Sequence, residues 1–166
     1  MFNFVMNNLP SMSQALTTNL TFKIKKANLL DLKFIHQSIQ SLSEQNIGLQ
    51  DFETLFKSKT KSQSFTIFIL EDRSRLGCNA GLLVVQLQQN LSDKWPTIEI
   101  QELFILPKYR KFKAADFLYT YLEQFAKDQK AYKIKVNCKI NSTLNQNFYT
   151  AKGFKISKKQ YVKEVY

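Results

Sequence analysis

The sequence predicts a single α/β domain built around a mixed, mostly antiparallel sheet, and three observations lead to that fold class. Segments in which apolar and polar residues alternate, as in half-buried strands, are interspersed with segments of helical spacing, in the order β-α-α-β-β-β-α-β-α-β. A chain of 166 residues fits one domain with a sizeable core. Hydrophobic residues make up 44% of the chain and only four Gly and three Pro occur, which argues against a linker-rich protein.

The first third of the chain predicts a leader, a strand and two helices. Residues 1–20 lack the basic start and unbroken apolar run of a signal peptide, and we expect a loosely ordered leader before a domain over 21–166. Residues 21–26 alternate apolar residues with Lys, as a strand with one wet face does. Asn28 suits the N-cap of a helix, whose apolar residues follow at helical spacing: Leu32, Ile35, Ile39 and Leu42. A short second helix is expected after Gly48, ending in a basic linker over 57–61.

The middle of the chain predicts a hairpin and a further strand. Residues 64–71 and 78–88 are rich in β-branched and aromatic residues, and a polar turn over 72–75 joins them, so the two strands should pair antiparallel. The next strand, over 99–106, ends at Pro107, because proline has no N–H to donate to a sheet ladder.

A basic turn and an amphipathic helix follow that strand. The turn carries four cationic side chains, Lys108, Arg110, Lys111 and Lys113. The helix is indicated by apolar residues on one face, Leu118, Tyr121, Leu122 and Phe125. A turn that aims backbone N–H groups and the positive end of a helix dipole at one point is typical of an anion site, usually for phosphate.

The last part of the chain predicts two strands around a short helix. Residues 132–138 alternate as a strand, which should lie parallel to the strand over 99–106 because a helix connects them. A short helix over 145–152 ends at Gly153, where the C-terminal position favours glycine for its positive φ. The final strand is expected over 154–165.

Charge and cysteine content limit the possible function classes. The net charge is +11, but the lysines are scattered over many segments, so we do not expect nucleic-acid binding, for which a clustered patch is the usual footprint. Cys78 and Cys138 have no CxxC spacing and the chain has one histidine, His36, so no metal site is expected, and both thiols should be buried and reduced. For His36 we expect a structural role. No apolar run is long enough for a membrane span, and we expect a soluble cytoplasmic protein.

Two motifs together carry a family resemblance. The pattern Ile105-x-Pro107-x-x-Arg110-x-x-x-x-Ala115 and the later Phe148-Tyr149-x-x-x-Gly153-Phe154 resemble the GCN5-related N-acetyltransferase (GNAT) superfamily over roughly residues 21 to 160. The stretch EIQELFILP is most similar to the aminoalkylphosphonate N-acetyltransferases. The resemblance implies the GNAT fold, with roughly six or seven strands flanked by about four helices. It also implies acetyl-CoA as co-substrate, a primary amine of a small molecule as acceptor, direct attack in a ternary complex, and a monomer or homodimer.

The same resemblance implies the catalytic residues. A protonated substrate amine must lose a proton before it attacks a thioester, and Glu99 is favoured as the base, through a water, with Glu102 as the other candidate. An offset of three puts these two side chains on different faces of a regular strand, so both face one pocket only if a bulge intervenes, as it does in the superfamily. Tyr149 matches the general acid that protonates the departing thiolate, and a backbone N–H near Leu103 or Phe104 would stabilise the oxyanion.

The resemblance further implies a binding site for the coenzyme. Lys113 stands where the superfamily's turn has its first glycine, a residue that lets backbone approach phosphate closely, while Arg110 and Ala115 match the pattern. The residues expected to bind coenzyme A are Leu103, Phe104, Ile105, Leu106, Arg110, Lys111, Phe112, Lys113, Ala114, Ala115, Asn141 and Asn145.

Two other functions stay open at the level of the sequence. The acceptor could be a macromolecular amine, such as a protein N-terminus or an aminoacyl-tRNA, and the Lys113 substitution keeps open a non-catalytic regulator that binds acyl-CoA. Among small acceptors, the positive charge favours an anionic molecule such as an aminoalkylphosphonate over a polycation such as an aminoglycoside.

Overall fold

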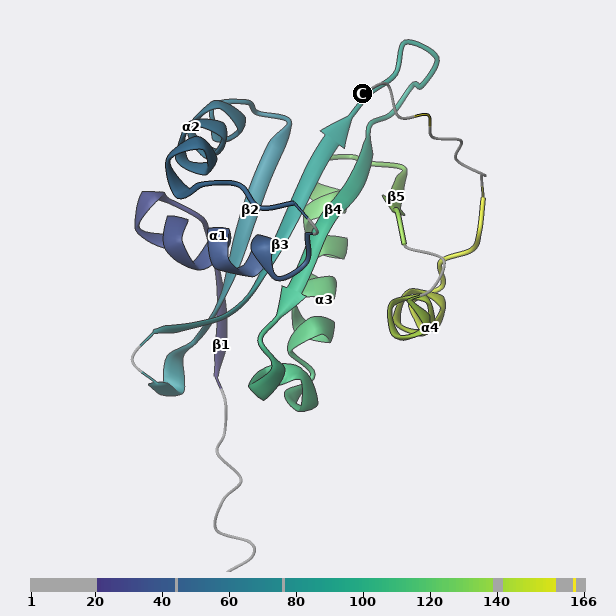
Figure 1. The fold of residues 1–166 in the computed structure, drawn as a ribbon. Coiled ribbons are helices and arrows are strands. Elements are labelled where there is room, and N and C mark those ends of the chain that lie inside the picture. The colour runs from purple at the N-terminus through teal and green to yellow at the C-terminus, as the bar shows by residue number, and fades with distance from the viewer. Residues whose placement is uncertain (1–20, 44, 76, 139–141, 158–162, 164–166) are drawn as a thin grey trace, which may run out of the picture. The chain divides into compact units, whose positions relative to one another are not determined.

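The structure is a computed structural model that describes residues 21–43, 45–75, 77–138, 142–157 and 163 (Figure 1). The chain divides into two compact units, one up to Lys135 and one from Val136 onward. The leader expected over 1–20 lies outside the described residues, and a single domain over 21–166 stays a prediction.

A mixed sheet of five strands forms the centre of the fold, in the order β1-β2-β3-β4-β5. The ladders β1–β2, β2–β3 and β3–β4 are antiparallel, which confirms the predicted hairpin of β2 and β3. The strands are β1 (Phe22–Lys26), β2 (Phe65–Asp72), β3 (Cys78–Gln88), β4 (Thr97–Ile105) and β5 (Lys133–Val136).

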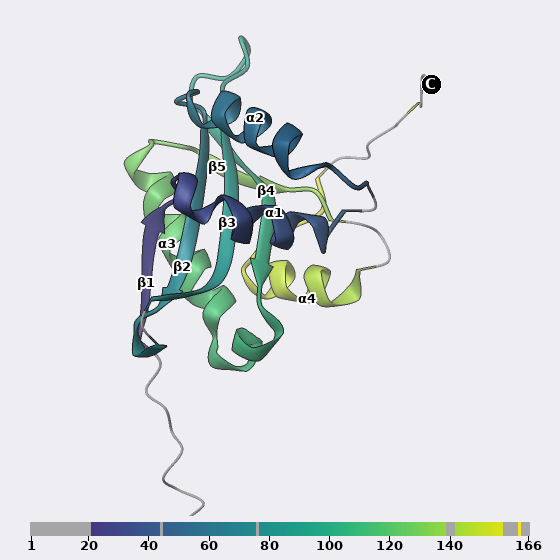
Figure 2. The ribbon, with the colours of Figure 1, turned by 60° about the vertical axis from the view of Figure 1, so that its left-hand side comes forward.

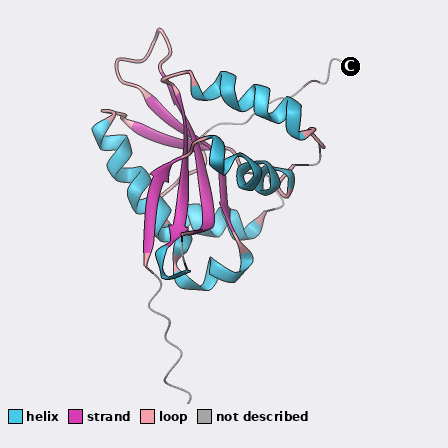
Figure 3. Ribbon diagram, turned by 90° about the vertical axis from the view of Figure 1, so that its left-hand side faces the viewer, coloured by secondary structure: helices cyan, strands magenta, loops and turns pink. Residues whose placement is uncertain are grey.

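Helices of the first unit cover both faces of the sheet. Figures 2 and 3 show α1 and α2 on one face and α3 on the other. Among the described residues of this unit, short 3₁₀ turns lie over Leu29–Asp31, Arg73–Arg75 and Pro107–Phe112. The helices are α1 (Leu32–Gln40), α2 (Leu49–Thr60) and α3 (Ala114–Asp128).

The start of α1 and the end of α2 show how local sequence sets helix bounds. Asn28 caps the 3₁₀ turn that leads into α1, because its side chain accepts from the Leu30 amide at 2.8 Å. The expected linker over 57–61 is wrong, since α2 continues to Thr60. Lys57 pairs with Glu53 one turn earlier, and lysines in a last turn complement the negative end of the helix dipole.

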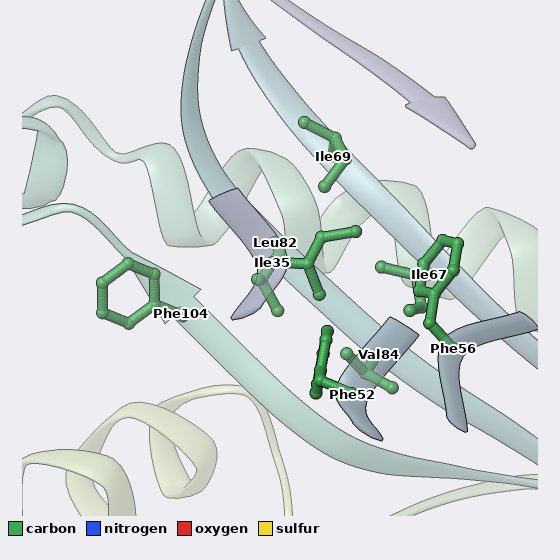
Figure 4. Packing of buried hydrophobic residues seen from close by; sticks show 8 residues of the cluster. All are labelled: Ile35, Phe52, Phe56, Ile67, Ile69, Leu82, Val84 and Phe104. Atoms are coloured by element: carbon green, nitrogen blue, oxygen red, sulfur yellow. The ribbon is translucent and has the colours of Figure 1, made fainter. Parts of the chain in front are cut away.

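Each face of the sheet has its own apolar core. On the α1/α2 face, Figure 4 shows Ile35 of α1 and Phe52 of α2 directed toward Leu82 and Val84 of β3, within a buried cluster completed by Phe56, Ile67, Ile69 and Phe104. On the α3 face, Leu118 and Leu122 are fully buried, and the Phe68 ring contacts Tyr121 and Phe125 edge to face at about 5 Å. The apolar face predicted for α3 is therefore confirmed.

The second unit contains one described helix, α4 (Thr143–Ala151), followed by Gly153 with φ +84° as predicted. The strand count of six or seven is wrong for the described residues, which form five strands. Residues 154–157 form no strand, and the rest of the expected last strand, apart from residue 163, lies outside the described residues.

Two further expectations concern single side chains. Cys78 is exposed at the start of β3, so the prediction of a buried thiol is wrong there, whereas Cys138 is half-buried and burial raises the pKa of its thiol. His36 has the expected structural role, because its Nε2 lies 2.8 Å from the Ile47 carbonyl oxygen and its ring contacts Phe52.

Candidate active site

A bulge in β4 brings two carboxylates to one face of the sheet. Val84 of β3 pairs with Glu102 and Val85 pairs with Ile100, so Gln101 is an extra residue with no partner position. Because cross-strand partners point to the same face, Glu102 shares the face of Val84, and Glu99 shares the face of its own partner, Gln86. Val84 and Gln86 are two residues apart and point the same way. Glu99 and Glu102 therefore both lie on the α1/α2 face.

Glu102 lies in a poorly solvated environment. The Val84 side chain opposite it belongs to the buried cluster under α1 and α2, and burial raises the pKa of the Glu102 carboxyl above its ordinary value of 4.5. Within the part of the chain that the structure describes, the Glu102 carboxylate has no hydrogen bond or ion pair. A carboxylate with a raised pKa and no partner is suited to take a proton from an amine.

Glu99 is in a different environment. Its Oε2 accepts a hydrogen bond from Gln88 Nε2 at 2.7 Å and lies 3.7 Å from the ammonium of Lys135 in β5. Lys135 also donates to Gln88 Oε1 at 3.2 Å, so the three side chains form a closed network. The Glu99 carboxylate is thus already occupied by a donor and a cation.

The end of β4 presents backbone groups in alternating directions. The Leu106 amide donates to the Ala80 carbonyl of β3 at 3.0 Å, and the Phe104 carbonyl oxygen also points at β3. By the alternation of strand backbone, the N–H groups of Leu103 and Ile105 point away from β3. The Ile105 carbonyl, which shares that direction, accepts from Arg110 Nε at 3.2 Å.

β3 approaches this part of β4 unusually closely at Gly81. A Cβ built on Gly81 would lie 2.5 Å from the Phe104 carbonyl oxygen and 2.6 Å from Ile105 Cδ1. Only glycine fits between the two strands at this position. The sequence analysis missed Gly81, although a glycine inside a strand pattern is a signal of such close approach.

The basic turn leads directly into the N-terminus of α3. Pro107 opens a 3₁₀ turn that runs to Phe112, and Lys113 then adopts the left-handed conformation (φ 57°, ψ 25°) as the N-cap of α3. The Lys113 side chain makes no capping hydrogen bond to the first turn of α3, and a helix N-terminus of this kind suits an anion. Glycine adopts the left-handed backbone most readily, and this chain adopts it with a lysine at position 113.

The side chains of the turn divide into buried and exposed sets. Tyr109 is buried, with 2% of its surface exposed, whereas the cationic residues around it are exposed. Lys108 lies over the Tyr109 ring and Lys111 over the Phe112 ring, at about 5 Å from each centroid. The turn therefore presents positive charge to solvent from a fixed base. The expected coenzyme residues at the end of β4, just after it and at the start of α3 are buried or half-buried, namely Leu103, Phe104, Ile105, Leu106, Ala114 and Ala115.

The second unit contains the remaining expected residues. Tyr149 of α4 is buried, and its ring contacts Phe148 and Phe154 at 5.3 and 5.2 Å between centroids. Asn145 is exposed in the first turn of α4, and Asn141 lies outside the described residues. A catalytic role of Tyr149 stays a prediction.

The structure brings together Glu99 and Glu102, and it adds partners that the sequence analysis missed. Gln88 and Lys135 hold Glu99, but they come from different strands and carry no sequence signal of that role. No group of three His, Cys, Asp or Glu side chains among the described residues is arranged to hold a metal ion. None of the helices in the described ranges has the length and apolar character needed to cross a bilayer.

Comparison with solved structures shows the fold. The chain is similar to glucosamine-6-phosphate N-acetyltransferase from Arabidopsis thaliana, with 19% identity, a TM-score of 0.70 and coverage of 87% of this chain and 99% of that one. It is similar to AAC(6')-Iy in complex with the bisubstrate analogue CoA-S-monomethyl-acetylneamine, with 15% identity, a TM-score of 0.73 and coverage of 87% and 97%. It is also similar to a Trypanosoma brucei acetyltransferase, with 14% identity, a TM-score of 0.72 and coverage of 87% and 100%.

Comparison of sequences shows the family. No curated protein matches the chain in sequence. The model of the acetyltransferase (GNAT) family matches residues 32–154, which is more than half of the chain. That match shows that this protein belongs to the acetyltransferase (GNAT) family and is an N-acetyltransferase.

Proposed function

We propose that the protein transfers the acetyl group of acetyl-CoA to a primary amine of a small molecule, by direct attack of the amine within a ternary complex. The observation that carries this proposal is the bulge at Gln101, which puts the desolvated carboxyl of Glu102 on the same face as Glu99. An ammonium ion is drawn to two carboxylates about 7 Å apart along the strand, and one of them is suited to deprotonate it.

In this proposal Glu102 is the general base. The sequence analysis favoured Glu99, acting through a water, but the Glu99 carboxylate accepts from Gln88 and lies beside the Lys135 ammonium. Glu102 has neither partner, and its raised pKa makes it a stronger base than an ordinary carboxylate. Glu99 then contributes negative charge that attracts the substrate ammonium.

Two further groups complete the proposed reaction. Of the two candidates for the oxyanion donor, the Leu103 amide is favoured, because it points away from β3 while the Phe104 backbone points toward β3. After the amine attacks the thioester carbonyl, collapse of the tetrahedral intermediate forms the amide and releases the thiolate. By its match to the family motif, Tyr149 is proposed to protonate that thiolate.

The coenzyme is proposed to bind through the turn before α3. The first amides of α3 and the exposed cations of the turn suit a diphosphate, and the left-handed backbone at Lys113 supports the fit, because it reproduces with lysine the conformation that glycine adopts most readily.

For the acceptor, we propose a small anionic amine such as an aminoalkylphosphonate or an amino sugar phosphate. The net charge of +11 attracts anions and repels polycations. Among the similar proteins, one is a glucosamine-6-phosphate N-acetyltransferase and another holds an acetylneamine analogue.

The test is thiol release from acetyl-CoA in the presence of an amine panel. The panel contains an aminoalkylphosphonate, glucosamine 6-phosphate, an aminoglycoside, a peptide with a free N-terminus and an aminoacyl-tRNA. We expect release with the small anionic amines. Glu102→Gln should abolish most of it, and Glu53→Gln, an exposed glutamate of α2 paired with Lys57, is the matched control. Release only with the peptide or the tRNA would refute the proposed acceptor class.

A further inference from the structure

A buried carboxylate connects the β2–β3 corner to the basic turn. Asp72 is the last residue of β2 and has no exposed surface. Its Oδ1 accepts from the Ser74 amide at 3.0 Å and from Ser74 Oγ at 2.6 Å. Its Oδ2 accepts from the Tyr109 hydroxyl at 3.0 Å, across 37 residues of sequence. A charged acceptor makes these hydrogen bonds strong, and burial removes competition from water.

Tyr109 is the buried anchor of the basic turn. It lies in the 3₁₀ turn Pro107–Phe112, and 2% of its surface is exposed. Its ring contacts Phe22 of β1 edge to face, with 6.1 Å between centroids, and Phe22 also contacts Phe117 of α3. The ring and the hydroxyl group of Tyr109 therefore both help to hold the turn against the sheet.

Tyr109 lies close in sequence to the start of α3, where the diphosphate is proposed to bind. Four residues after Tyr109, Lys113 adopts the left-handed backbone that opens the first turn of α3 to an anion. A residue held in a sparsely populated conformation keeps it only when the surrounding structure determines it more strongly. The 3₁₀ turn that contains Tyr109 ends at Phe112, directly before Lys113.

We propose that Asp72 is a positioning residue for the coenzyme: through the Tyr109 hydroxyl, it sets the geometry of the amides that receive the diphosphate of acetyl-CoA. This inference rests on the proposed function of that turn. Asp72 makes no direct contact with the reacting atoms in the proposal, so its loss affects binding of the coenzyme and leaves the chemical step intact.

The test compares two thioester substrates in the full-length protein. In Tyr109→Phe, which keeps the ring and removes the hydroxyl, we expect the KM for acetyl-CoA to rise about tenfold, as loss of one hydrogen bond to a charged group predicts, with kcat within about twofold. S-acetylpantetheine lacks the diphosphate, so its kcat/KM should be the same in Tyr109→Phe and in the wild type. Tyr119→Phe removes the hydroxyl of another buried tyrosine, which hydrogen-bonds to Glu123 within α3, and should leave the kinetics with both substrates unchanged.

A second variant supports the assignment to Asp72. In Asp72→Asn the side-chain oxygen can accept from Ser74 or from Tyr109, while the amide group faces the other donor. We expect the KM of Asp72→Asn for acetyl-CoA to lie between those of the wild type and Tyr109→Phe. The double variant Asp72→Asn/Tyr109→Phe should have the same KM as Tyr109→Phe alone. Should Asp72→Asn fail to fold, Tyr109→Phe with the two substrates still decides the question.

The outcomes separate this inference from the proposed function. An equal loss with acetyl-CoA and S-acetylpantetheine, or no loss with either, would overturn the positioning role of Asp72 while acetyl transfer stands. A wild-type protein that bound no coenzyme A in calorimetry would overturn the proposed function and this inference together.

Discussion

Replacing Lys113 by glycine tests whether the backbone at the end of the basic turn is strained. Lys113 has φ 57° and ψ 25°, in the left-handed region, and its side chain is exposed. An L-residue in that region loses about 1–2 kcal/mol relative to the right-handed conformation because Cβ crowds its own carbonyl oxygen. Glycine has no Cβ, but it loses about 0.5–1 kcal/mol more backbone entropy on folding.

The difference between these two effects sets the expected magnitude. Lys113→Gly should raise the free energy of unfolding by about 0.5–1 kcal/mol, since no buried contact of an exposed side chain is lost. For a chain of this size, that corresponds to a rise in Tm of roughly 1–4 °C.

The assay is thermal unfolding followed by circular dichroism, with a matched control at the other end of the same helix. Lys130 has φ 54° just after α3, where Lys130 and Ala131 donate to the carbonyls of Lys127 and Ala126 at 2.9 Å. Lys130→Gly should therefore raise the Tm by a similar amount. Lys113→Gln, which keeps the strain and removes the charge, should leave the Tm unchanged.

Coenzyme binding separates the two sites. We expect the affinity for coenzyme A to fall about two- to fivefold in Lys113→Gln, in a salt-dependent manner, because an exposed cation beside the diphosphate is lost. Lys130→Gly should bind as the wild type does. If Lys130→Gly gains stability and Lys113→Gly does not, the backbone at Lys113 in the basic turn is not strained.

The remaining predictions concern the bulged strand and α4. Glu102→Gln should slow turnover on the order of 100- to 10,000-fold. Burial raises the pKa of Glu102, so its charge lowers the stability of the wild type as the pH rises above 4.5. Urea unfolding should therefore show the variant to be more stable than the wild type at pH 7 and equally stable at pH 4. Gly81→Ala should lower the free energy of unfolding by about 1–3 kcal/mol and remove most of the activity, because its Cβ would meet the Phe104 carbonyl. Gly48→Ala makes no such contact, so the same urea titration should show little change in its free energy of unfolding. Tyr149→Phe keeps the ring contacts and should lower kcat on the order of 100-fold or more with KM unchanged; full steady-state activity would exclude it as the general acid.

Residues close in sequence determined much of the fold. The periods of two and of 3.6 residues predicted β1 to β5 and the four helices in order, because each period reflects which side chains a single element turns toward a core. Pro107 ended β4 and Gly153 followed α4 with positive φ, since these restraints act within one or two residues. The basic turn between β4 and α3 was also predictable, from Pro107 and the four cationic residues that precede a helical pattern.

The position of Glu99 and Glu102 on one face depended on pairing between distant strands. From the sequence, Glu99 and Glu102 lie on one face only if a bulge intervenes, and the register of β4 against β3 puts that bulge at Gln101. The environments of the two carboxyls also come from elsewhere in the chain: Gln88 and Lys135 occupy Glu99, while Glu102 lies opposite a buried valine and has a raised pKa. Local periodicity carries no information about register or desolvation, because both arise from atoms that only the folded sheet brings together.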